Sequence, residues 1–349
     1  MAEITFMIGN GFDLNCGLKS KFTDTYEGYI EHNKNKDSNT IKKFKRIIDK
    51  KIENWADFEL ALARYAKDFQ SKEEIIECIR DYKAYLYEYL QKEQEQFWSK
   101  NNKLLQSQNS ILKEIGRSLA RFYCDLKPYD VDNISPCFHD KSVNYHFINF
   151  NYTDIFDKLI ESAFNQGMVS AYLKSAKTDP KSIHIHGKLG EDLILGLDNT
   201  EQLSELPYKF TEDTEMEIIK PSFLKIYDNV RLRVTKEILD QSIVICLFGL
   251  SLQDSDMSWR KMLARWLSSE YHAHHLVFFT QDNMNKKYHP SAKTQMIEDE
   301  NKCKRDYINL LYGESVSKEI EHRVFPRLHF PVGTRIFDFG EEFSNNEKA

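Results

Sequence analysis

The sequence predicts an α/β protein with a Rossmann-like, mostly parallel sheet and a large helical insertion after its first strand. Short apolar, β-branched segments alternate with longer segments of helical periodicity, which is the order of a doubly wound sheet. Residues 22–126 contain two glycines and no proline, so helices can run through them with few interruptions. The apolar run 242–249 is typical of a parallel strand buried on both faces.

The first strand is expected at Ile4–Ile8, because this β-branched and aromatic segment ends at Gly9. Residues 22–126 then carry apolar side chains at helical spacing and predict four or five helices, with a loop at 32–40. We expect Pro128 to end this helical block, since proline lacks the backbone N–H that a continuing helix needs.

The second half of the chain predicts the rest of the sheet. The strongest strand patterns are 143–150 and 242–249, followed by helices from Asp154 and from about Asp256 to Tyr271. Shorter strands are expected at 182–186, 193–197 and 275–280, partly helical stretches at 201–217 and 221–240, and edge strands within 325–339. These elements divide the chain into a sheet core (1–20 and 140–285), a helical insertion (21–139) and a C-terminal extension packed on the core (286–349).

Composition limits the classes of protein to which the chain can belong. Its 349 residues carry 48 basic and 54 acidic side chains, a net charge of −6, so no overall positive field favours nucleic acid. The longest apolar run is too short to cross a bilayer. Six cysteines are scattered without a Cys-x-x-Cys pair. We therefore expect a cytoplasmic protein with no metal, no membrane partner and no disulfide framework.

The turn Gly9-Asn10-Gly11-Phe12-Asp13 is the first candidate site. It lies where a strand passes into a helix, and glycines there let backbone N–H groups approach a phosphate. The standard dinucleotide fingerprint has a third glycine where this chain has Leu14. The alternative is a tight strand-to-helix turn that binds nothing.

Polar residues also end the strand at 143–150. Asn149 and Asn151 share one face of that strand, and Thr153 follows them. Ligands of open parallel sheets bind beyond the carboxyl ends of the strands, so these side chains are well placed. The alternative is helix capping by Thr153 or Asp154.

Two histidines lie on one face of a short strand in His184-Ile185-His186, which Gly187 follows. His-x-His is a common metal spacing, although one pair supplies only two ligands. The other interpretations are a structural histidine and a general base, a role that suits imidazole near neutral pH.

The strand at 242–249 ends in Gly249-Leu250-Ser251 and again precedes a helix. Gly249 allows close approach to the backbone, and Ser251 offers a hydroxyl to a phosphate or ribose. The alternative is a capped turn, with Asp254 or Ser255 as the cap.

Five segments spread from Ile8 to Asp256 occur in a recognisable order. They are Ile8-Gly9-Asn10-Gly11-Phe12-Asp13-Leu14, Trp55-Ala56-Asp57-Phe58-Glu59, Asn149-Phe150-Asn151-Tyr152-Thr153, His184-Ile185-His186-Gly187, and the segment from Gly249-Leu250-Ser251 to Asp256. In this order they resemble the AbiH family of bacterial phage abortive-infection proteins. A role in halting phage infection is what the resemblance implies.

The same segments are similar, more distantly, to the NAD-binding core of sirtuins. The turn at 9–11 keeps the spacing of the sirtuin glycine turn, and the turn at 249–251 resembles a second turn that meets the cofactor. Asn151 and His186 fall where sirtuins have an asparagine and the catalytic histidine. The chain lacks the sirtuin zinc-binding cysteines and has Thr153 in place of an aspartate.

The resemblance implies an enzyme that hydrolyses NAD, its substrate, to nicotinamide and ADP-ribose. In this reading Asn151 positions the attacking water or the ribose, His186 is a base, and the two glycine turns hold the pyrophosphate. The expected NAD-binding residues are Gly9, Asn10, Gly11, Phe12, Asp13, Asn149, Thr153, Gly187, Gly249 and Ser251.

Two other functions stay open. One is a catalytically inert nucleotide-binding module that signals through a partner. The other is a HEPN-type ribonuclease, since Arg265 and His272 fit its loose Arg-x(4–6)-His spacing. The expected partners are NAD or a related nucleotide, a phage-derived activator and further copies of the chain in a homo-oligomer.

Overall fold

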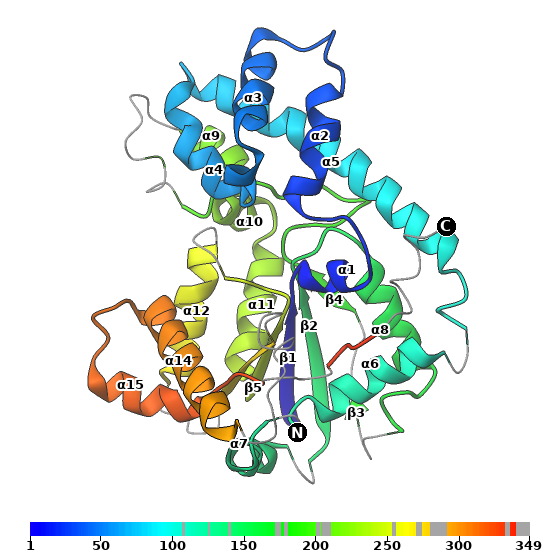
Figure 1. Cartoon of the computed structure of the whole chain (residues 1–349), viewed down its shortest axis with the longest axis vertical. Helices are drawn as coiled ribbons and strands as arrows, with labels where there is room; N and C mark the ends of the chain where they lie inside the picture. The colour runs from blue at the N-terminus through cyan, green and yellow to red at the C-terminus, as the bar shows by residue number, and fades with distance from the viewer. Residues whose placement is uncertain are drawn as a thin grey trace.

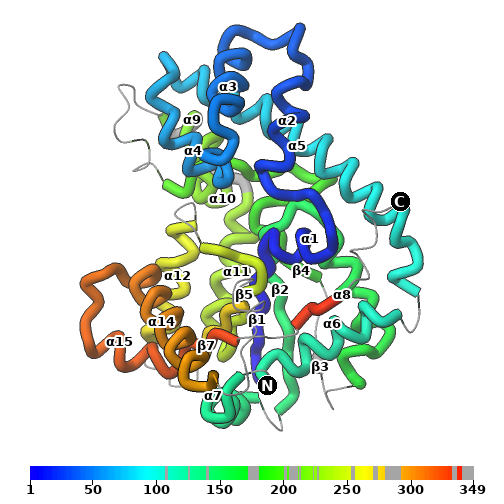
Figure 2. Tube along the Cα trace, viewed as in Figure 1, coloured from blue at the N-terminus to red at the C-terminus, as the bar shows by residue number. Residues whose placement is uncertain are grey.

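The structure is a computed structural model, and it has two parts, a block of helices and a part built round a sheet (Figures 1 and 2). It describes residues 1–106, 109–124, 126–138, 141–171, 176–177, 181–199, 203, 211–252, 256–269, 274–279, 292–331 and 336–339.

Within the described residues, seven strands form one open sheet, and every pair is parallel. They are β1 (Ala2–Ile8), β2 (Val143–Asn149), β3 (Ala176–Lys177), β4 (Ser182–His184), β5 (Val244–Phe248), β6 (His275–Phe279) and β7 (Leu328–His329). The order is β3-β2-β1-β5-β6-β7, and β4 also pairs with β2. Ile8 is level with Asn149 on one side and Phe248 on the other, so the three strands that precede the predicted site segments end side by side.

The chain changes direction across the sheet at β1. It leads outward from β1 to β2, β3 and β4, and then crosses to β5, β6 and β7 on the other side. Connections that leave the carboxyl ends of β1 and β5 therefore part in opposite directions, which is where open α/β sheets bind their ligands. The topology places the ligand-binding end of this fold directly after Ile8, Asn149 and Phe248.

Helices cover both faces of the sheet (Figure 1). One face packs against α6 (Ser110–Arg121) and α8 (Ile155–Asn165), and the other against α11 (Asn229–Gln241), α12 (Met257–Leu267) and α14 (Lys293–Tyr312). Side chains alternate along β1, so Phe6 and Ile8 enter the first core and Met7 enters the second. The short helices α7 (Pro128–Ile134) and α15 (Lys318–Val324) complete this part of the molecule.

The helical block has a hydrophobic core of its own. It contains α2 (Phe22–Glu31), α3 (Asn39–Lys50), α4 (Phe58–Tyr65) and the first half of α5 (Lys72–Lys100). From much later in the chain come α9 (Glu212–Ile218), whose Ile218 enters this core, and α10 (Lys220–Tyr227), which leads back to the sheet. Aromatic rings fill the core, as where Phe58 and Tyr82 stack with ring centroids 4.4 Å apart.

The α/β class, the parallel sheet and the helices after the first strand are as predicted. The strand predicted at 193–197 is wrong, because this segment runs between two cores rather than along the sheet. Ile194 packs beside the sheet, whereas Leu195 and Leu197 pack in the helical block, so the apolar run reflects two contacts on opposite sides. In the described part of the chain, this segment has one β-bridge, from Leu197 to Ile219.

Pro128 does not end the helical region as expected. It is the first residue of α7, where its missing N–H costs nothing. The three-part division of the chain stays a prediction. The hydrophobic cores do not follow its boundaries, because α6 lies within the predicted insertion (21–139) and packs on the sheet. In the described part of the chain, no helix is both long and apolar enough to cross a membrane.

Candidate functional site

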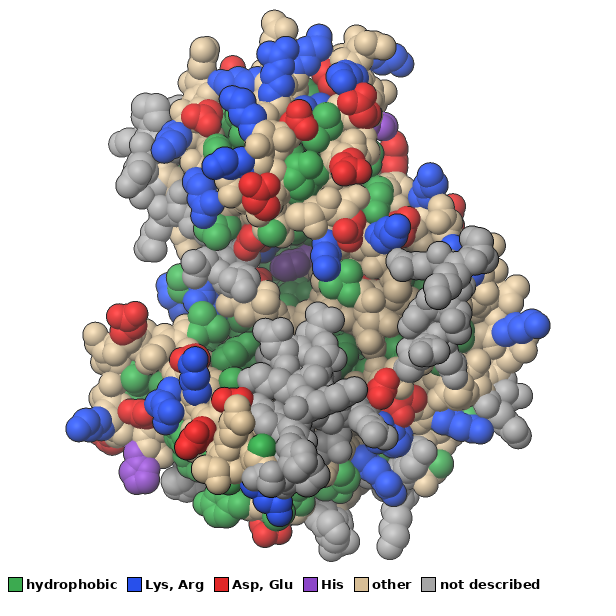
Figure 3. Space-filling model, viewed as in Figure 1, with side chains coloured by type: hydrophobic (Ala, Val, Ile, Leu, Met, Phe, Trp, Pro, Cys, Tyr) green, Lys and Arg blue, Asp and Glu red, His purple; other side chains and the backbone are tan. Residues whose placement is uncertain are grey.

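A cavity of about 320 Å³ opens between the carboxyl ends of β1, β2 and β5 and the helical block. Figure 3 shows the surface hollowed where these two parts of the molecule meet. The described residues that line the cavity are Asn10, Asp13, Ser20, Lys21, Phe22, Thr23, Ala56, Asp57, Glu59, Leu86, Leu90, Phe150, Asn151, Tyr152, Thr153, His186, Lys220, Gly249, Leu250, Ser251 and Asp256.

The cavity brings together predicted site residues from four separate segments. Those that line it are Asn10, Asp13, Asn151, Thr153, His186, Gly249 and Ser251. The other predicted residues are not among its lining: Gly9, Gly11, Phe12, Asn149 and Gly187. Both groups have a local structural reason for their position.

The glycines of the two turns bring backbone against backbone. A Cβ on Gly9 would lie 2.4 Å from the carbonyl oxygen of Gly249, and one on Gly11 would lie 2.4 Å from the Gly249 Cα. Gly249 also has φ +64°, a conformation that favours glycine. The Gly9 N–H donates to the Phe248 carbonyl and the Gly11 N–H to the Gly249 carbonyl, so both donors are already used.

Asn10 and Phe12 hold the first turn in place. The Asn10 amide donates to the Ser20 carbonyl at 3.1 Å and accepts from the Ser20 hydroxyl at 2.5 Å. The Phe12 ring is fully buried and packs edge-on against Phe156 with centroids 5.0 Å apart, and its N–H donates to the Gly9 carbonyl. The following helix, α1 (Gly11–Asn15), is only five residues long.

Asp13, Asn151 and Thr153 form a buried polar group at the edge of the cavity. The Thr153 hydroxyl donates to Asp13 Oδ2 at 2.6 Å, and the Asn151 amide nitrogen donates to Asp13 Oδ1 at 3.3 Å. Burial raises the pKa of Asp13 to about 7, although the hydrogen bond from Thr153 opposes this shift. Thr153 therefore holds Asp13 rather than capping α8.

The oxygen of the Asn151 side chain has no hydrogen-bond partner among the described residues. Asn151 is only 4% exposed, so bulk water cannot readily satisfy this acceptor. Its amide nitrogen is directed to Asp13, which leaves the oxygen as the free acceptor. The cavity therefore presents one buried acceptor to a hydroxyl or a water.

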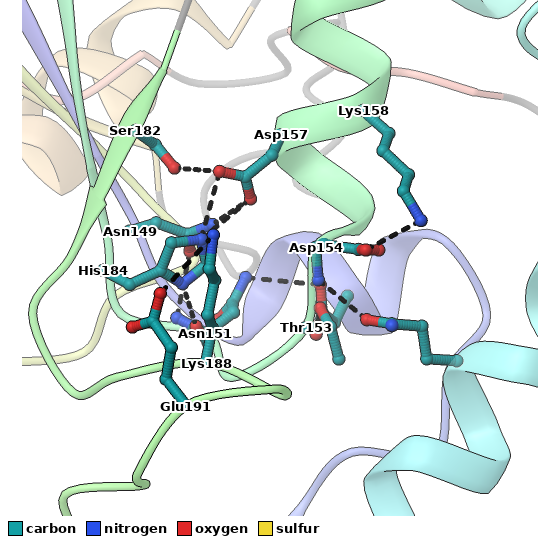
Figure 4. A network of polar contacts seen from close by, with 12 residues as sticks. Asn149, Asn151, Thr153, Asp154, Asp157, Lys158, Ser182, His184, Lys188 and Glu191 are labelled. Carbon is teal, nitrogen blue, oxygen red and sulfur yellow. Dashed lines mark hydrogen bonds and ion pairs between the residues drawn. The ribbon is translucent and has the colours of Figure 1, made fainter.

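His184 lies beside Asn151 in a network of polar contacts that also includes Asp157 and Ser182 (Figure 4). Its Nδ1 lies 2.8 Å from the Asn151 carbonyl oxygen and its Nε2 lies 2.9 Å from Asp157 Oδ2, so both ring nitrogens face acceptors. Asp157 also accepts from Asn149 at 3.2 Å and from Ser182. Burial opposes ionisation of Asp157, but the hydrogen bond and charge of His184 lower its pKa below the ordinary value.

This network explains the two polar positions nearest the site. Asn149 donates to Asp157 and accepts from the backbone N–H of Asn151 at 2.9 Å, so it shapes the turn that carries Asn151. His184 is accordingly a structural histidine. Gly187 has φ +75°, and a Cβ there would lie 2.1 Å from the Asp192 carbonyl oxygen, so it serves the turn after His186.

His186 faces the cavity, with its ring edge-on to Phe150 at a centroid distance of 5.4 Å. Within the described residues, the structure assigns its imidazole no hydrogen bond. Burial, together with the charge of Lys220, lowers its pKa well below the ordinary value. The ring is therefore neutral at pH 7 and can accept a proton or a hydrogen bond.

Carboxyl groups from the helical block and from the turn after β5 face the same cavity. Glu59 Oε2 lies 2.5 Å from Lys220 Nζ, and both side chains are buried. Burial raises the pKa of Glu59 to about 7, against the effect of Lys220. Burial also raises the pKa of Asp256, helped by the charge of the nearby Asp57.

Sequence reasoning did not single out these four residues as site residues. Asp57 and Glu59 were visible in the segment Trp55-Ala56-Asp57-Phe58-Glu59, and Asp256 ended another of the quoted segments. Their positions in the resemblance were a usable signal. Lys220 gave none, since only the folded chain brings it 2.5 Å from Glu59.

No group of three or more His, Cys, Asp or Glu in the described part of the chain is arranged to hold a metal ion. His272 of the Arg-x(4–6)-His pattern lies outside the described residues, as do Asp254 and Ser255. Arg265 lies on α12 and lines a second cavity, which also contains His186.

A comparison with protein families gives one match. The model of the family described as bacteriophage abortive infection AbiH matches residues 5–279, which include every residue of the cavity. None of the curated proteins compared with the chain matches it.

Proposed function

The chain belongs to the AbiH family of bacteriophage abortive-infection proteins, and we propose that it acts in abortive infection by hydrolysing NAD to nicotinamide and ADP-ribose in the cavity at the end of the sheet. The observation that carries this proposal is the free side-chain oxygen of Asn151. The resemblance to sirtuins assigns an asparagine at this position to the ribose or the attacking water. A buried acceptor without a partner in the protein is the group expected to receive such a ligand.

The charges round the cavity suit the cleavage of a glycosidic bond. Breaking the bond between nicotinamide and ribose leaves positive charge on the ribose ring, because the transition state resembles an oxocarbenium ion. Asp13, Glu59 and Asp256 all face the cavity and can stabilise that charge when ionised. Buried groups act strongly here, since little water screens them.

The reaction needs one water and releases one proton. The bond between the ribose C1′ and the nicotinamide nitrogen breaks, and the electron pair leaves with nicotinamide, which becomes neutral. The water oxygen bonds to C1′, and one of its protons passes to a base. His186 is neutral and faces the cavity, and Asp13, with a pKa of about 7, is a second acceptor near Asn151.

Asp13 offers a carboxyl group near the position where the sirtuin pattern has an aspartate and this chain does not. Thr153 stands where sirtuins have an aspartate, but its hydroxyl donates to Asp13 at 2.6 Å. A carboxyl group is therefore present beside Asn151 after all, supplied from the turn after β1. This supports retention of the chemistry despite the changed residue.

The test is chromatography of products after purified full-length protein is incubated with NAD. We expect nicotinamide and ADP-ribose from the unmodified protein and loss of about 100-fold in rate for Asn151→Ala and for His186→Ala. Asn144→Ala is the matched control, because Asn144 lies at the opposite end of β2 and bonds to Glu3. Equal product from all four proteins would refute the assignment of the site.

An inert nucleotide-binding module is the second candidate, and the environment of His186 favours it. An imidazole with a strongly lowered pKa is a weak base. This candidate predicts that NAD raises the melting temperature of the protein while no nicotinamide forms. Product formation would exclude it.

A further inference from the structure

A second cavity of about 410 Å³ adjoins the first. Acidic side chains predominate among the charged residues of the first cavity, and basic side chains predominate in the second. His186 and Lys220 line both cavities, so they form the boundary between them. The second cavity adds Lys236, Lys261 and Arg265, and its only described carboxyl is Asp198. The Asp198 carboxylate already accepts the N–H and hydroxyl of Ser258, at 3.0 and 3.1 Å.

The cations that the second cavity adds come from two helices, two from α12 and one from α11. Lys261 and Arg265 are four residues apart on α12, and Lys236 lies on α11, four residues after the lining residue Leu232. All three are exposed side chains, and none has an ion-pair partner within the described residues. Three unpaired cations round one cavity favour an anionic ligand.

The first cavity is unsuitable for the phosphates of a dinucleotide. Its carboxyl groups would repel the two negative charges of a pyrophosphate. Of the four backbone positions from Gly9 to Phe12 that were expected to hold the pyrophosphate, Gly9, Gly11 and Phe12 have their N–H groups bonded within the protein. A substrate with phosphates needs another place for them.

We infer that the second cavity is the phosphate-binding subsite, on Lys236, Lys261 and Arg265. The proposal rests on the proposed function and specifies its substrate class: a nucleotide whose pyrophosphate lies in the basic cavity while its nicotinamide ribose lies in the acidic one. His186 lies between the two halves. A nucleoside without phosphates occupies the acidic cavity alone.

The test compares two double variants that remove the same charge. Lys261→Gln with Arg265→Gln alters the subsite, and Lys302→Gln with Arg305→Gln alters exposed residues on α14 as the control. Binding of ADP-ribose is measured by isothermal titration calorimetry. We expect the first variant to bind roughly tenfold or more weakly and the control to bind like the unmodified protein.

Kinetics give a second readout. The first variant should show a raised KM for NAD with kcat nearly unchanged, whereas hydrolysis of nicotinamide riboside, which has no pyrophosphate, should be unaffected. A loss with both substrates would overturn the subsite, as would equal ADP-ribose affinity in all three proteins or no affinity in any.

The two proposals can fail separately. Weakened ADP-ribose binding in the first variant, without NAD hydrolysis by any protein, would uphold the subsite and refute the hydrolase. Hydrolysis of NAD with no difference between the two variants would uphold the hydrolase and refute the subsite.

Discussion

Charged side chains are buried at both ends of the sheet, but they are paired in different ways. At the carboxyl end lie the cavity carboxyls, which are Asp13, Glu59 and Asp256. Near the amino-terminal end lies the closed cluster, which is Lys127, Asp130, His275, Glu300, Lys304 and His329. The first group faces an open volume, and the second is packed between α7, α14 and the edge of the sheet.

In the closed cluster each acidic group meets cations. Lys304 Nζ lies 3.2 Å from Glu300 and 3.7 Å from Asp130, and Lys127 pairs with Glu300. His329 Nδ1 lies 3.3 Å from the Asp130 carboxylate. Burial opposes ionisation of Asp130, but His329 and Lys304 lower its pKa below the ordinary value.

Among the cavity carboxyls, Asp13 takes the hydrogen bonds found in the described part of the chain from neutral side chains, those of Thr153 and Asn151. Its pKa is raised to about 7, and its neighbour Asn151 keeps a free oxygen. The difference separates two uses of buried charge. Paired charge stabilises one packing, whereas incompletely satisfied polar groups lower stability and leave a place for a ligand.

The largest loss of stability is expected from a variant that breaks the closed cluster. Asp130→Ala leaves His329 without its carboxylate partner and Lys304 with Glu300 alone, and should lower the free energy of unfolding by about 3 kcal/mol. Urea denaturation measures it. The rate of NAD hydrolysis per folded molecule should not change, and a loss confined to activity would contradict the structural role.

Asp13→Asn tests the opposite end. We expect hydrolysis to fall about 100-fold, because the carboxylate near the ribose is gone. Stability should rise at pH 8: the folded pKa of Asp13 lies above its unfolded value, so ionisation between about pH 4 and 7 lowers the stability of the unmodified protein by up to about 4 kcal/mol.

Denaturation of both proteins at pH 5 and pH 8 checks this sign. The advantage of Asp13→Asn should grow with pH. Asp132→Asn, an exposed carboxyl on α7, is the control and should show no such growth.

The closed cluster should depend on pH in the opposite direction. Burial, reinforced by His329 and Arg327, lowers the pKa of His275 to about 3. Since the unfolded imidazole takes up protons first, stability is fully present above about pH 6.5 and falls by about 3 kcal/mol down to pH 4. His275→Phe should reduce this slope, of which His329 causes a part because burial lowers its pKa too, and an unchanged slope would show that His275 does not contribute.

The smallest effect is expected for Glu59→Gln. Burial raises the pKa of Glu59 to about 7, so a neutral amide of nearly the same shape removes a charge that burial already disfavours. The free energy of unfolding should change by less than about 1 kcal/mol at pH 6. A loss of stability as large as that expected for Asp130→Ala would show that the cavity carboxyls stabilise the fold as the closed cluster does.

Much of the fold could be predicted from local sequence. The apolar run around Val244–Phe248 and the helical spacing through Phe58 and Tyr82 report burial directly, and β5, α4 and α5 form. The strand prediction for 193–197 was wrong because the apolar residues of this segment face two cores. That arrangement gives the same sequence pattern as a strand. The two-residue strand β3 has too few residues to show any period.

The site was predictable where polar residues follow a strand. Asn151 and His186 reach the cavity for that reason, and topology then joins them. The residue pattern alone did not separate His184 from His186, and the choice of His186 came from the resemblance to sirtuins. Their contacts differ in the folded chain, because His184 bonds to Asp157 and His186 lines the cavity. The positions of Lys220 and of the cations on α11 and α12 also depend on contacts between distant segments, which local patterns do not contain.

The pairing of Glu59 with Lys220 joins residues 161 positions apart, and the helical block completes its core only with Ile218 and Ile219. During synthesis the N-terminal helices leave the ribosome long before these partners do. The cavity cannot assemble until the chain has emerged past Asp256. A nascent chain therefore has no complete cavity before that point, so a ligand of this site can bind only after synthesis has passed Asp256.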